Sequence, residues 1–162
     1  MAIAVRLGEQ GDVDGAVSVY LRSNLVRRQG RPIPPSRIDE VTATLRDPAT
    51  WFVVAGDGPT LVGMASAKPA RRDLGAGPVI PGACYLDLLF VLPERWGQGI
   101  GGVILDAVVD EARGRDYASI QLWTHEDNER SHRLYRSRRF SPTGVRRAGG
   151  DGGPVAEWGR HL

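Results

Sequence analysis

The chain has 162 residues, of which 41% are hydrophobic and 25% charged, and its formal net charge is only +2. These values are typical of one folded domain with a sizeable core and exclude a disordered chain. Charged residues, glycine or proline interrupt every apolar run, so no membrane span is expected, and the N-terminus lacks the pattern of a secretory signal, which favours a cytoplasmic protein.

The first part of the chain predicts a short strand followed by two helices. Residues 2–7 fit the strand. Asp12 can cap a helix that runs to about Arg28, and Ser36 can cap a second helix that ends near residue 47. The first helix has an apolar face made of Val13, Ala16, Val17, Tyr20, Leu21 and Leu25.

Two strands come next. Residues 51–55 and 60–67 flank an Asp57-Gly58-Pro59 turn, which predicts a hairpin. Residues 69–81 are rich in glycine and proline and predict an unusually long loop, which is either a functional flap or disordered.

The second half alternates strands and helices, and includes one strand–helix–strand crossover. The expected elements are a strand at 83–91, a helix at 99–114, a strand at 118–124, a short helix at 128–138 and closing strands at 140–147 and 155–160. The expected inner faces of the two helices hold Val103, Ile104, Ala107, Val108 and Ala112 in the first, and Ser131, Leu134 and Tyr135 in the second.

The cysteine and histidine residues give little support for a metal site or for thiol chemistry. Cys84 is the only cysteine, so an internal disulfide and a thiolate metal cluster are excluded, and we expect it to be a buried filler. His125, His132 and His161 lack ligand spacing and are expected at the surface. The sequence therefore predicts no metal.

The most informative segment is a glycine-rich turn between a buried strand and an amphipathic helix. Gly97, Gly99, Gly101 and Gly102 leave backbone N–H groups uncovered at a helix N-terminus, where the helix dipole favours a phosphate or pyrophosphate. A Cβ would hold such a ligand off the backbone. A turn that serves tight packing alone is the alternative.

Two known phosphate-binding loops fit this segment poorly. A Walker A loop needs a lysine after its last glycine, and Lys68, the only lysine, lies far upstream. Gly97, Gly99 and Gly102 match the spacing of a dinucleotide fingerprint. Residues 92–96, however, intervene after the strand, and too little chain follows for the rest of that sheet.

The segment closely resembles motif A of the GNAT superfamily of N-acetyltransferases, which reads Gln or Arg, two residues, Gly, one residue, then Gly or Ala. Here residues 91–101 read Val-Leu-Pro-Glu-Arg-Trp-Gly-Gln-Gly-Ile-Gly, and Trp96 stands where Gln or Arg is usual. Residues 128–140 resemble motif B, with Arg139 in place of the usual glycine. Both blocks have the order and spacing of the family. The resemblance covers residues 84–147 well, and the first third only in its order of elements.

The resemblance implies an α+β fold, with a mixed, mostly antiparallel central sheet flanked by about four helices, as one domain over residues 1–162. It also implies acetyl-CoA as cosubstrate, held at a strand–helix–strand site. The residues that this resemblance assigns to the cosubstrate are Leu89, Val91, Trp96, Gly97, Gln98, Gly99, Ile100, Gly101, Gly102, Asn128, Ser131, Arg133 and Arg138.

Their roles follow from the same resemblance. The backbone of residues 89–91 pairs with the pantetheine arm, and an N–H near Val91 stabilises the oxyanion. The glycine turn donates N–H groups to the pyrophosphate, and Arg133 or Arg138 contacts the outer phosphates.

Tyr135 is the expected general acid. It follows Asn128 by two helical turns, so both residues lie on one side of their helix. In the family this tyrosine protonates the departing sulfur, and the asparagine fixes the local cofactor geometry. The pKa of a phenol, about 10, is close enough to that of a thiol, about 8.5, for such a transfer. A core aromatic without a chemical role is the alternative.

Asp87 is the candidate general base. Strand alternation puts it on the same face as Tyr85, Leu89 and Val91. A lone acid in an apolar strand is costly unless it is paired or functional. Asp87 either recognises or deprotonates the amine or pairs with an arginine, and a chain of water molecules is an equally open choice of base.

The predicted function is transfer of an acetyl group to a primary amine, with a small molecule favoured, by direct attack in a ternary complex. A protein N-terminal or lysine acetyltransferase and a non-catalytic acyl-CoA-binding sensor are the alternatives. Residues 20–35 and 69–81 are expected to select the acceptor. The late arginines lack interleaved exposed aromatics, so no nucleic-acid partner is expected, and a homodimer is possible.

Overall fold

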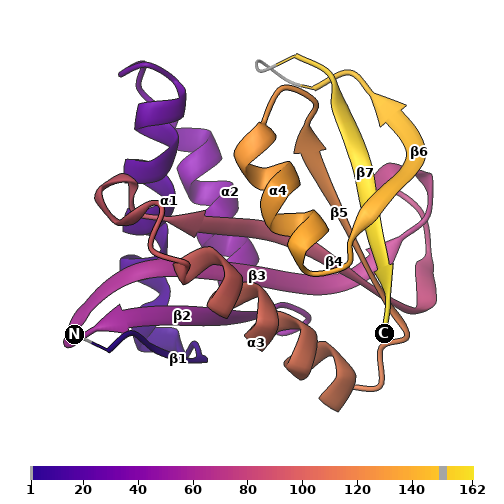
Figure 1. Cartoon of the computed structure of the whole chain (residues 1–162), viewed down its shortest axis with the longest axis horizontal. Coiled ribbons are helices and arrows are strands. Elements are labelled where there is room, and N and C mark those ends of the chain that lie inside the picture. Colours follow the sequence, from indigo (N-terminus) through magenta and orange to yellow (C-terminus); the bar gives the residue numbers. More distant parts are fainter. Residues whose placement is uncertain (1, 150–152) are drawn as a thin grey trace. The chain divides into compact units, whose positions relative to one another are not determined.

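The structure is a computed structural model that describes residues 2–149 and 153–162. Its strands form a seven-stranded sheet in the order β1-β2-β3-β4-β5-β7-β6, and the described residues include four α-helices (Figure 1). The mixed, mostly antiparallel sheet with about four helices is confirmed. The strands are β1 (Ala4–Leu7), β2 (Trp51–Asp57), β3 (Thr60–Arg71), β4 (Val79–Val91), β5 (Ser119–His125), β6 (Ser141–Arg147) and β7 (Val155–His161). The helices are α1 (Val13–Arg27), α2 (Pro35–Arg46), α3 (Ile100–Gly114) and α4 (Glu129–Ser137), with short 3-10 turns η1 (Gln10–Asp12), η2 (Asp73–Gly75) and η3 (Pro93–Arg95).

The chain divides into two compact units. The first unit comprises Met1–Lys68 and Leu88–Val108, and the second comprises Pro69–Asp87 and Val109–Leu162. No helix in the described ranges is both long and apolar enough to cross a membrane.

The first unit contains an antiparallel meander of β1, β2 and β3. Val5 lies opposite Ala55, and Trp51 lies opposite Ala67. The apolar side chains of β2, residues 51–55, are all buried, as expected for a run rich in β-branched and aromatic residues. The predicted hairpin is confirmed, and both strands run further than the sequence indicated.

The helices of the first unit correct two predictions. The buried side chains of α1 include Val13, Ala16, Val17 and Tyr20, but Leu25 is 44% exposed because the whole last turn, residues 25–27, faces solvent. In α2, Pro34 is the N-cap and Pro35 the first helical residue, so the prediction that Ser36 caps this helix is wrong. Proline suits that position because its missing N–H would have no intrahelical partner there.

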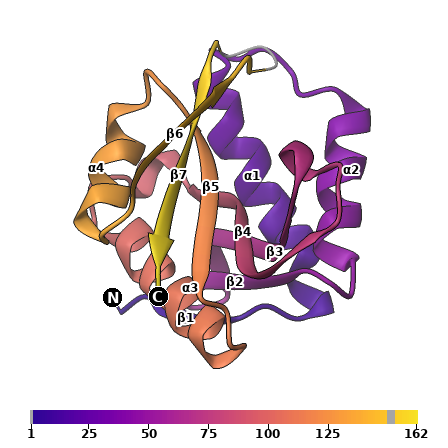
Figure 2. The same ribbon diagram turned by 90° about the vertical axis from the view of Figure 1, so that its right-hand side faces the viewer.

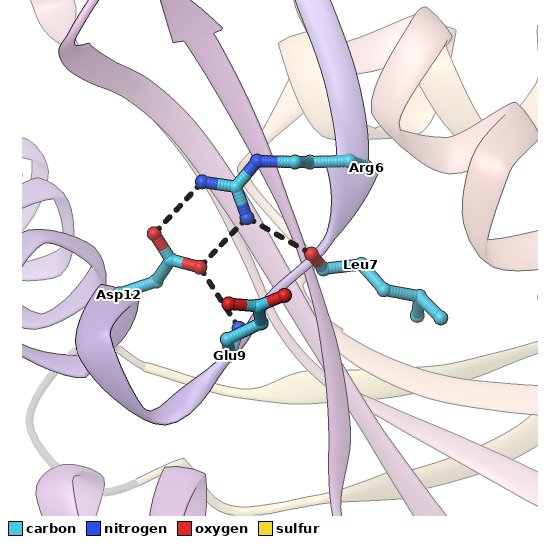
Figure 3. Close-up of polar contacts among 4 residues, drawn as sticks. All are labelled: Arg6, Leu7, Glu9 and Asp12. Atoms are coloured by element: carbon cyan, nitrogen blue, oxygen red, sulfur yellow. Dashed lines mark hydrogen bonds and ion pairs between the residues drawn. The ribbon is translucent and has the colours of Figure 1, made fainter.

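Asp12 holds the start of α1 against β1, although it does not do so as a simple cap. It occupies the N-cap position, but its side chain accepts no hydrogen bond from α1. Its carboxylate instead accepts two hydrogen bonds from the Arg6 guanidinium, at 2.7 and 2.9 Å, and one from the Glu9 backbone N–H at 2.8 Å (Figure 3). Arg6 also donates to the Leu7 carbonyl at 3.0 Å. The hydrogen bonds from Arg6 lower the pKa of Asp12.

This pair predicts a pH-dependent effect of Asp12→Asn. The pKa of Asp12 is lower in the folded than in the unfolded chain, so its stabilising contribution is full above the unfolded pKa, about 3.9, and is lost as the pH falls through the folded pKa. We expect Asp12→Asn to lower Tm by a few degrees near pH 7, which is the size of effect that loss of one helix cap gives. In acid, the decrease in Tm should be smaller. Thermal unfolding across pH checks this. A Tm difference that stays constant, or grows, below about pH 4 contradicts it.

The second unit contains the parallel strand pair that a strand–helix–strand crossover requires. Cys84 of β4 lies opposite Ile120 of parallel β5, and β7 pairs antiparallel with both β5 and β6 (Figure 2). Cys84 is fully buried, as predicted, and burial raises the pKa of its thiol to about 12.

The predicted loop at 69–81 is wrong. The strand β3 continues to Arg71 and β4 begins at Val79, so the segment is largely the end of a hairpin. Its tip is closed by hydrogen bonds from the Arg72 N–H to the Pro78 carbonyl, at 2.9 Å, and from the Gly77 N–H to the Arg72 carbonyl, at 2.8 Å. The proline and glycine content suggested a loop. The sequence does not show which backbone groups of this segment pair with a neighbouring strand, so the strand ends were missed.

The histidine predictions hold only in part. His161 is exposed, but His132 is 7% exposed because its ring stacks on Trp158 of β7, with 5.1 Å between ring centroids. One ring nitrogen, Nε2, lies 3.1 Å from the His125 carbonyl oxygen. Trp158 and His132 are distant in sequence, so the helical pattern around His132 gave no sign of this contact.

Candidate functional site

The glycine turn of the first unit has the geometry of an anion cradle. Gly97 and Gly99 have φ of 78° and 79°, in the left-handed region that favours glycine. A Cβ added at either position would meet no atom within 4 Å, so the space beside the backbone is open. The helix α3 begins immediately afterwards, at Ile100, and its first N–H groups, those of Ile100, Gly101 and Gly102, have no intrahelical acceptor. These residues fit a pyrophosphate.

The turn is anchored by a residue that the sequence did not single out. Arg95 donates from its Nη1 atom to Asp57 Oδ2, at the end of β2, at 2.9 Å, and from its Nε atom to Gln98 Oε1 at 3.0 Å. The Arg95 and Asp57 side chains are only 22% and 17% exposed, which strengthens the ion pair relative to a surface pair. Gln98 therefore contacts Arg95 through its side chain and leaves its backbone N–H for a ligand.

The end of β4 is fixed through the Val91 carbonyl. This oxygen accepts hydrogen bonds from Ser23 Oγ of α1, at 2.9 Å, and from Trp96 Nε1, at 2.8 Å. Two donors match the two lone pairs of a carbonyl oxygen. Trp96, which replaces the family's Gln or Arg, thus links the turn back to the strand that precedes it. Ser23, which is 5% exposed, was missed because only the fold brings it to Val91.

The remaining first-unit candidates lie on the same strand. Leu89 and Val91 are half-buried at the end of β4. Between them, the Phe90 ring packs edge-on against Tyr20 of α1, with 5.3 Å between ring centroids. In the first turns of α3, Ile104 is buried, but Val103 is 48% exposed, so its predicted place on the inner face is wrong.

The second unit brings Asn128, Ser131 and Tyr135 together on α4. Asn128 is the N-cap, and its side-chain oxygen accepts a hydrogen bond from the Ser131 backbone N–H at 3.2 Å. This contact gives Asn128 a structural role at the start of the helix. Ser131 and Leu134 are half-buried.

Tyr135 is a buried phenol in an aromatic cluster. It is 7% exposed, and its ring centroid lies 5.9 Å from that of Phe140 and 6.2 Å from that of Trp158. Burial raises its pKa to about 12, so the hydroxyl group is protonated throughout the neutral range. Tyr135 therefore packs within the aromatic cluster and also keeps its phenolic proton.

The arginines assigned to the outer phosphates lie on or next to α4. Arg133 is exposed on the helix, and Arg138, which follows it, donates from its Nη1 atom to Ser137 Oγ at 3.1 Å. The backbone of Arg138 is also engaged, since its carbonyl accepts a hydrogen bond from Arg160 at 3.0 Å.

Arg139 adopts the conformation of the glycine that it replaces. Its φ is 65°, and the helix closes with hydrogen bonds from the Phe140 N–H to the Tyr135 carbonyl, at 3.0 Å, and from the Arg139 N–H to the Arg136 carbonyl, at 3.1 Å. A left-handed residue that ends a helix is usually glycine, because a Cβ is strained there.

Arg139→Gly is therefore expected to stabilise the chain. Relief of the left-handed strain contributes about 1 kcal/mol, which corresponds to a rise in Tm of about 2–4 °C for a chain of this length. Differential scanning calorimetry measures the change. Arg133→Gly, in the exposed interior of the same helix, is the matched control and is expected to lower Tm. A fall in Tm for both variants contradicts the assignment of strain to Arg139.

Asp87 lies half-buried on β4. The preceding residues Cys84 and Leu86 are buried on the opposite face, so Asp87 shares its face with the half-buried Tyr85, as strand alternation predicted. In the described residues, no cluster of His, Cys, Asp and Glu is arranged to hold a metal ion.

The comparisons with known proteins agree with this geometry. The structure is similar to the ribosomal-protein-S18-alanine N-acetyltransferase of Escherichia coli, with TM-score 0.77, 16% identity, and 99% of this chain and 94% of that chain covered. A Brucella melitensis ribosomal-protein-alanine N-acetyltransferase gives TM-score 0.75 and 22% identity over 98% and 99% of the two chains. The Thermoplasma acidophilum PaiA N-acetyltransferase, in complex with coenzyme A, gives TM-score 0.69 and 17% identity over 97% and 98%.

At these identities, the three structures establish the fold. No curated protein sequence matches the chain. The sequence profile of the acetyltransferase (GNAT) family matches residues 18–140, which is about three quarters of the chain and includes both the glycine turn and α4. The chain therefore belongs to the GNAT family of acetyltransferases.

Proposed function

We propose that the protein transfers the acetyl group of acetyl-CoA to the primary amine of a small molecule, by direct attack in a ternary complex, and that residues 1–162 act as one catalytic domain. The observation that carries this proposal is the glycine turn at the start of α3. Left-handed Gly97 and Gly99, the open space beside them and the unpaired N–H groups of the first helical turn together suit a pyrophosphate.

Acetyl-CoA supplies an activated thioester, and the residues of β4 orient it. The backbone of Leu89 and Val91 is assigned to the pantetheine arm, and an N–H near Val91 to the oxyanion that forms when the amine attacks the carbonyl carbon. The hydrogen bonds of Ser23 and Trp96 occupy the Val91 carbonyl and hold the strand end in one position, so the assignment at Val91 concerns its N–H group. A preorganised donor is what oxyanion stabilisation requires.

The proton transfers use the second unit. The attacking amine must be neutral and loses a further proton as the C–N bond forms, and Asp87 or water accepts that proton. The C–S bond breaks to release a thiolate, to which Tyr135 donates its phenolic proton. The raised pKa of Tyr135 keeps that proton in place before the reaction.

A second candidate function is acetylation of a protein N-terminus. Two of the similar structures are, by their names, N-acetyltransferases of ribosomal-protein alanine, at 16% and 22% identity. The two candidates differ in the acceptor and share the cosubstrate.

The test combines cosubstrate binding with turnover. Thermal unfolding is measured with and without acetyl-CoA, and at a hundredfold excess over Kd linkage gives about 2.7 kcal/mol of stabilisation. Thiol release is then followed with small primary amines and with peptides that have a free N-terminal alanine. Turnover with the small amines supports the proposal, and turnover with the peptides alone favours the second candidate. A thermal shift without turnover on any acceptor indicates an acyl-CoA sensor, and no shift at all overturns the cosubstrate assignment.

A further inference from the structure

A pocket of about 360 Å³ lies entirely within the second unit. The hairpin tip, β4, β5, β6 and β7 contribute its walls, which include Arg72, Tyr85, Gln121, Trp123, Arg147 and Glu157. The volume is at the lower end of the range for ligand pockets and suits one small molecule. The hairpin residues belong to the segment 69–81 that the sequence associated with choice of the acceptor.

Two cations in this pocket lack an acidic partner. Within residues 2–149 and 153–162, neither Arg72 nor Arg147 forms an ion pair. The Arg147 guanidinium lies instead over the Trp123 ring, 4.3 Å from its centroid, in a cation–π contact. A planar guanidinium held in this way presents paired N–H donors to a carboxylate.

Two further charged side chains of the hairpin tip, Arg71 and Asp73, also line the pocket. Arg71 donates to the Gly77 carbonyl at 3.2 Å. The Asp73 carboxylate lies so close to Gly77 that an added Cβ would be 2.7 Å from its Oδ2 atom. The pocket lining therefore carries three arginines, Arg71, Arg72 and Arg147, and two carboxylates, Asp73 and Glu157.

Glu157 provides the complementary negative charge. Register places it opposite Trp123 on the neighbouring strand, so the two side chains leave the same face of the sheet. Its Oε1 atom accepts a hydrogen bond from Thr143 Oγ1 at 2.7 Å, which orients the carboxylate without neutralising it. A pocket lined by three arginines and two carboxylates is complementary to a ligand that carries both an acid and an amine.

One pocket residue lies on the same strand as the candidate base. Tyr85 lines the pocket and precedes Asp87 by two residues on the same face of β4, a spacing of about 7 Å along a strand.

We propose that this pocket binds the acceptor and that the acceptor is an amino acid. Its carboxylate pairs with Arg72 and Arg147, and its amine is drawn towards Glu157. This inference rests on the proposed function and narrows its acceptor to primary amines that carry a carboxylate.

The test compares ligands that differ only by the carboxylate. Isothermal titration calorimetry with saturating coenzyme A measures Kd for L-phenylalanine and 2-phenylethylamine, L-methionine and 3-(methylthio)propylamine, and L-tryptophan and tryptamine. We expect at least one amino acid to bind about tenfold more tightly than its matched amine. Arg147→Gln and Arg72→Gln are expected to reduce this difference to about threefold or less, and Arg147→Lys to retain part of it. Arg46→Gln, an exposed site on α2, is the matched control and leaves the difference unchanged.

Each outcome has a distinct meaning. Equal or tighter binding of the plain amines overturns the carboxylate proposal, as does the absence of binding by any amino acid of the panel. The proposal is also overturned if Arg147→Gln raises Kd equally for an amino acid and for its matched amine. Equal weakening indicates general damage to the pocket and no contact with the carboxylate. The proposed function is tested separately, since acetyl-CoA stabilisation and thiol release with plain amines survive a failure of this inference.

Discussion

Gly101→Glu is expected to abolish most acetyl-CoA binding while leaving the free protein at least as stable. Gly101 lies in the first turn of α3, where a glutamate improves helix propensity and interacts favourably with the helix dipole. The same carboxylate would occupy the proposed pyrophosphate site and repel its negative charge. We expect Kd for acetyl-CoA to rise about 100-fold, equivalent to about 2.7 kcal/mol. Titration calorimetry measures the loss, and Tm without ligand measures the effect on folding.

Gly101→Glu is informative because it is expected to weaken acetyl-CoA binding without lowering Tm. Gly101→Ala, which adds a Cβ without charge, is the intermediate control and is expected to weaken binding less. Gly11→Ala is the matched control outside the turn, because an added Cβ there meets nothing within 4 Å. If Gly101→Glu binds acetyl-CoA like the wild type, the pyrophosphate does not lie at this turn. If its Tm falls steeply, the variant has damaged the fold, and the Gly101→Ala affinity then decides the assignment.

The second half of the fold was predictable because its signals are local. A glycine turn before a helix and the apolar spacing of a short amphipathic helix are both read from neighbouring residues. Residues 97–102 and Asn128 accordingly lie where the sequence placed them. Left-handed φ at Gly97 and Gly99 gives the physical reason for those glycines.

The contacts that fix these local elements were not predictable. The Ser23 and Trp96 bonds to the Val91 carbonyl, and the Arg95–Asp57 ion pair, join residues whose proximity depends on the completed sheet. His132 is buried for the same reason, through Trp158 on a later strand. Helical periodicity also fails at helix ends, where Leu25 has an apolar spacing but no surface to cover it.

The conformation of Arg139 could not be predicted from the sequence, because an arginine stands where the resembling motif has a glycine. The helix was expected to end at residue 138, but arginine is unusual at a left-handed position. The family pattern has a glycine at this point, and the chain retains that conformation, with φ of 65°. The closing hydrogen bond of Phe140 to the Tyr135 carbonyl shows that the strain is located next to the proposed general acid.

Tyr135→Phe is expected to lower kcat for thiol release about 100-fold with little change in stability. Loss of general acid catalysis costs about 10²–10⁴-fold, and the lower value applies because a phenol with a pKa of about 12 is a weak acid towards a thiolate. The ring contacts with Phe140 and Trp158 are retained by phenylalanine, so Tm should change by no more than a few degrees. Initial rates at saturating acetyl-CoA and amine give the comparison.

The loss on Tyr135→Phe is expected to be independent of pH. Because the pKa of Tyr135 is raised, the phenol stays protonated well above neutral pH, and the ratio of wild-type to Tyr135→Phe rates should be constant between about pH 7 and 9. Tyr117→Phe, at a half-buried tyrosine with no assigned role, is the matched control and should retain activity within about twofold. A Tyr135→Phe rate within about twofold of the wild type would remove this residue from the chemistry and leave water to protonate the sulfur.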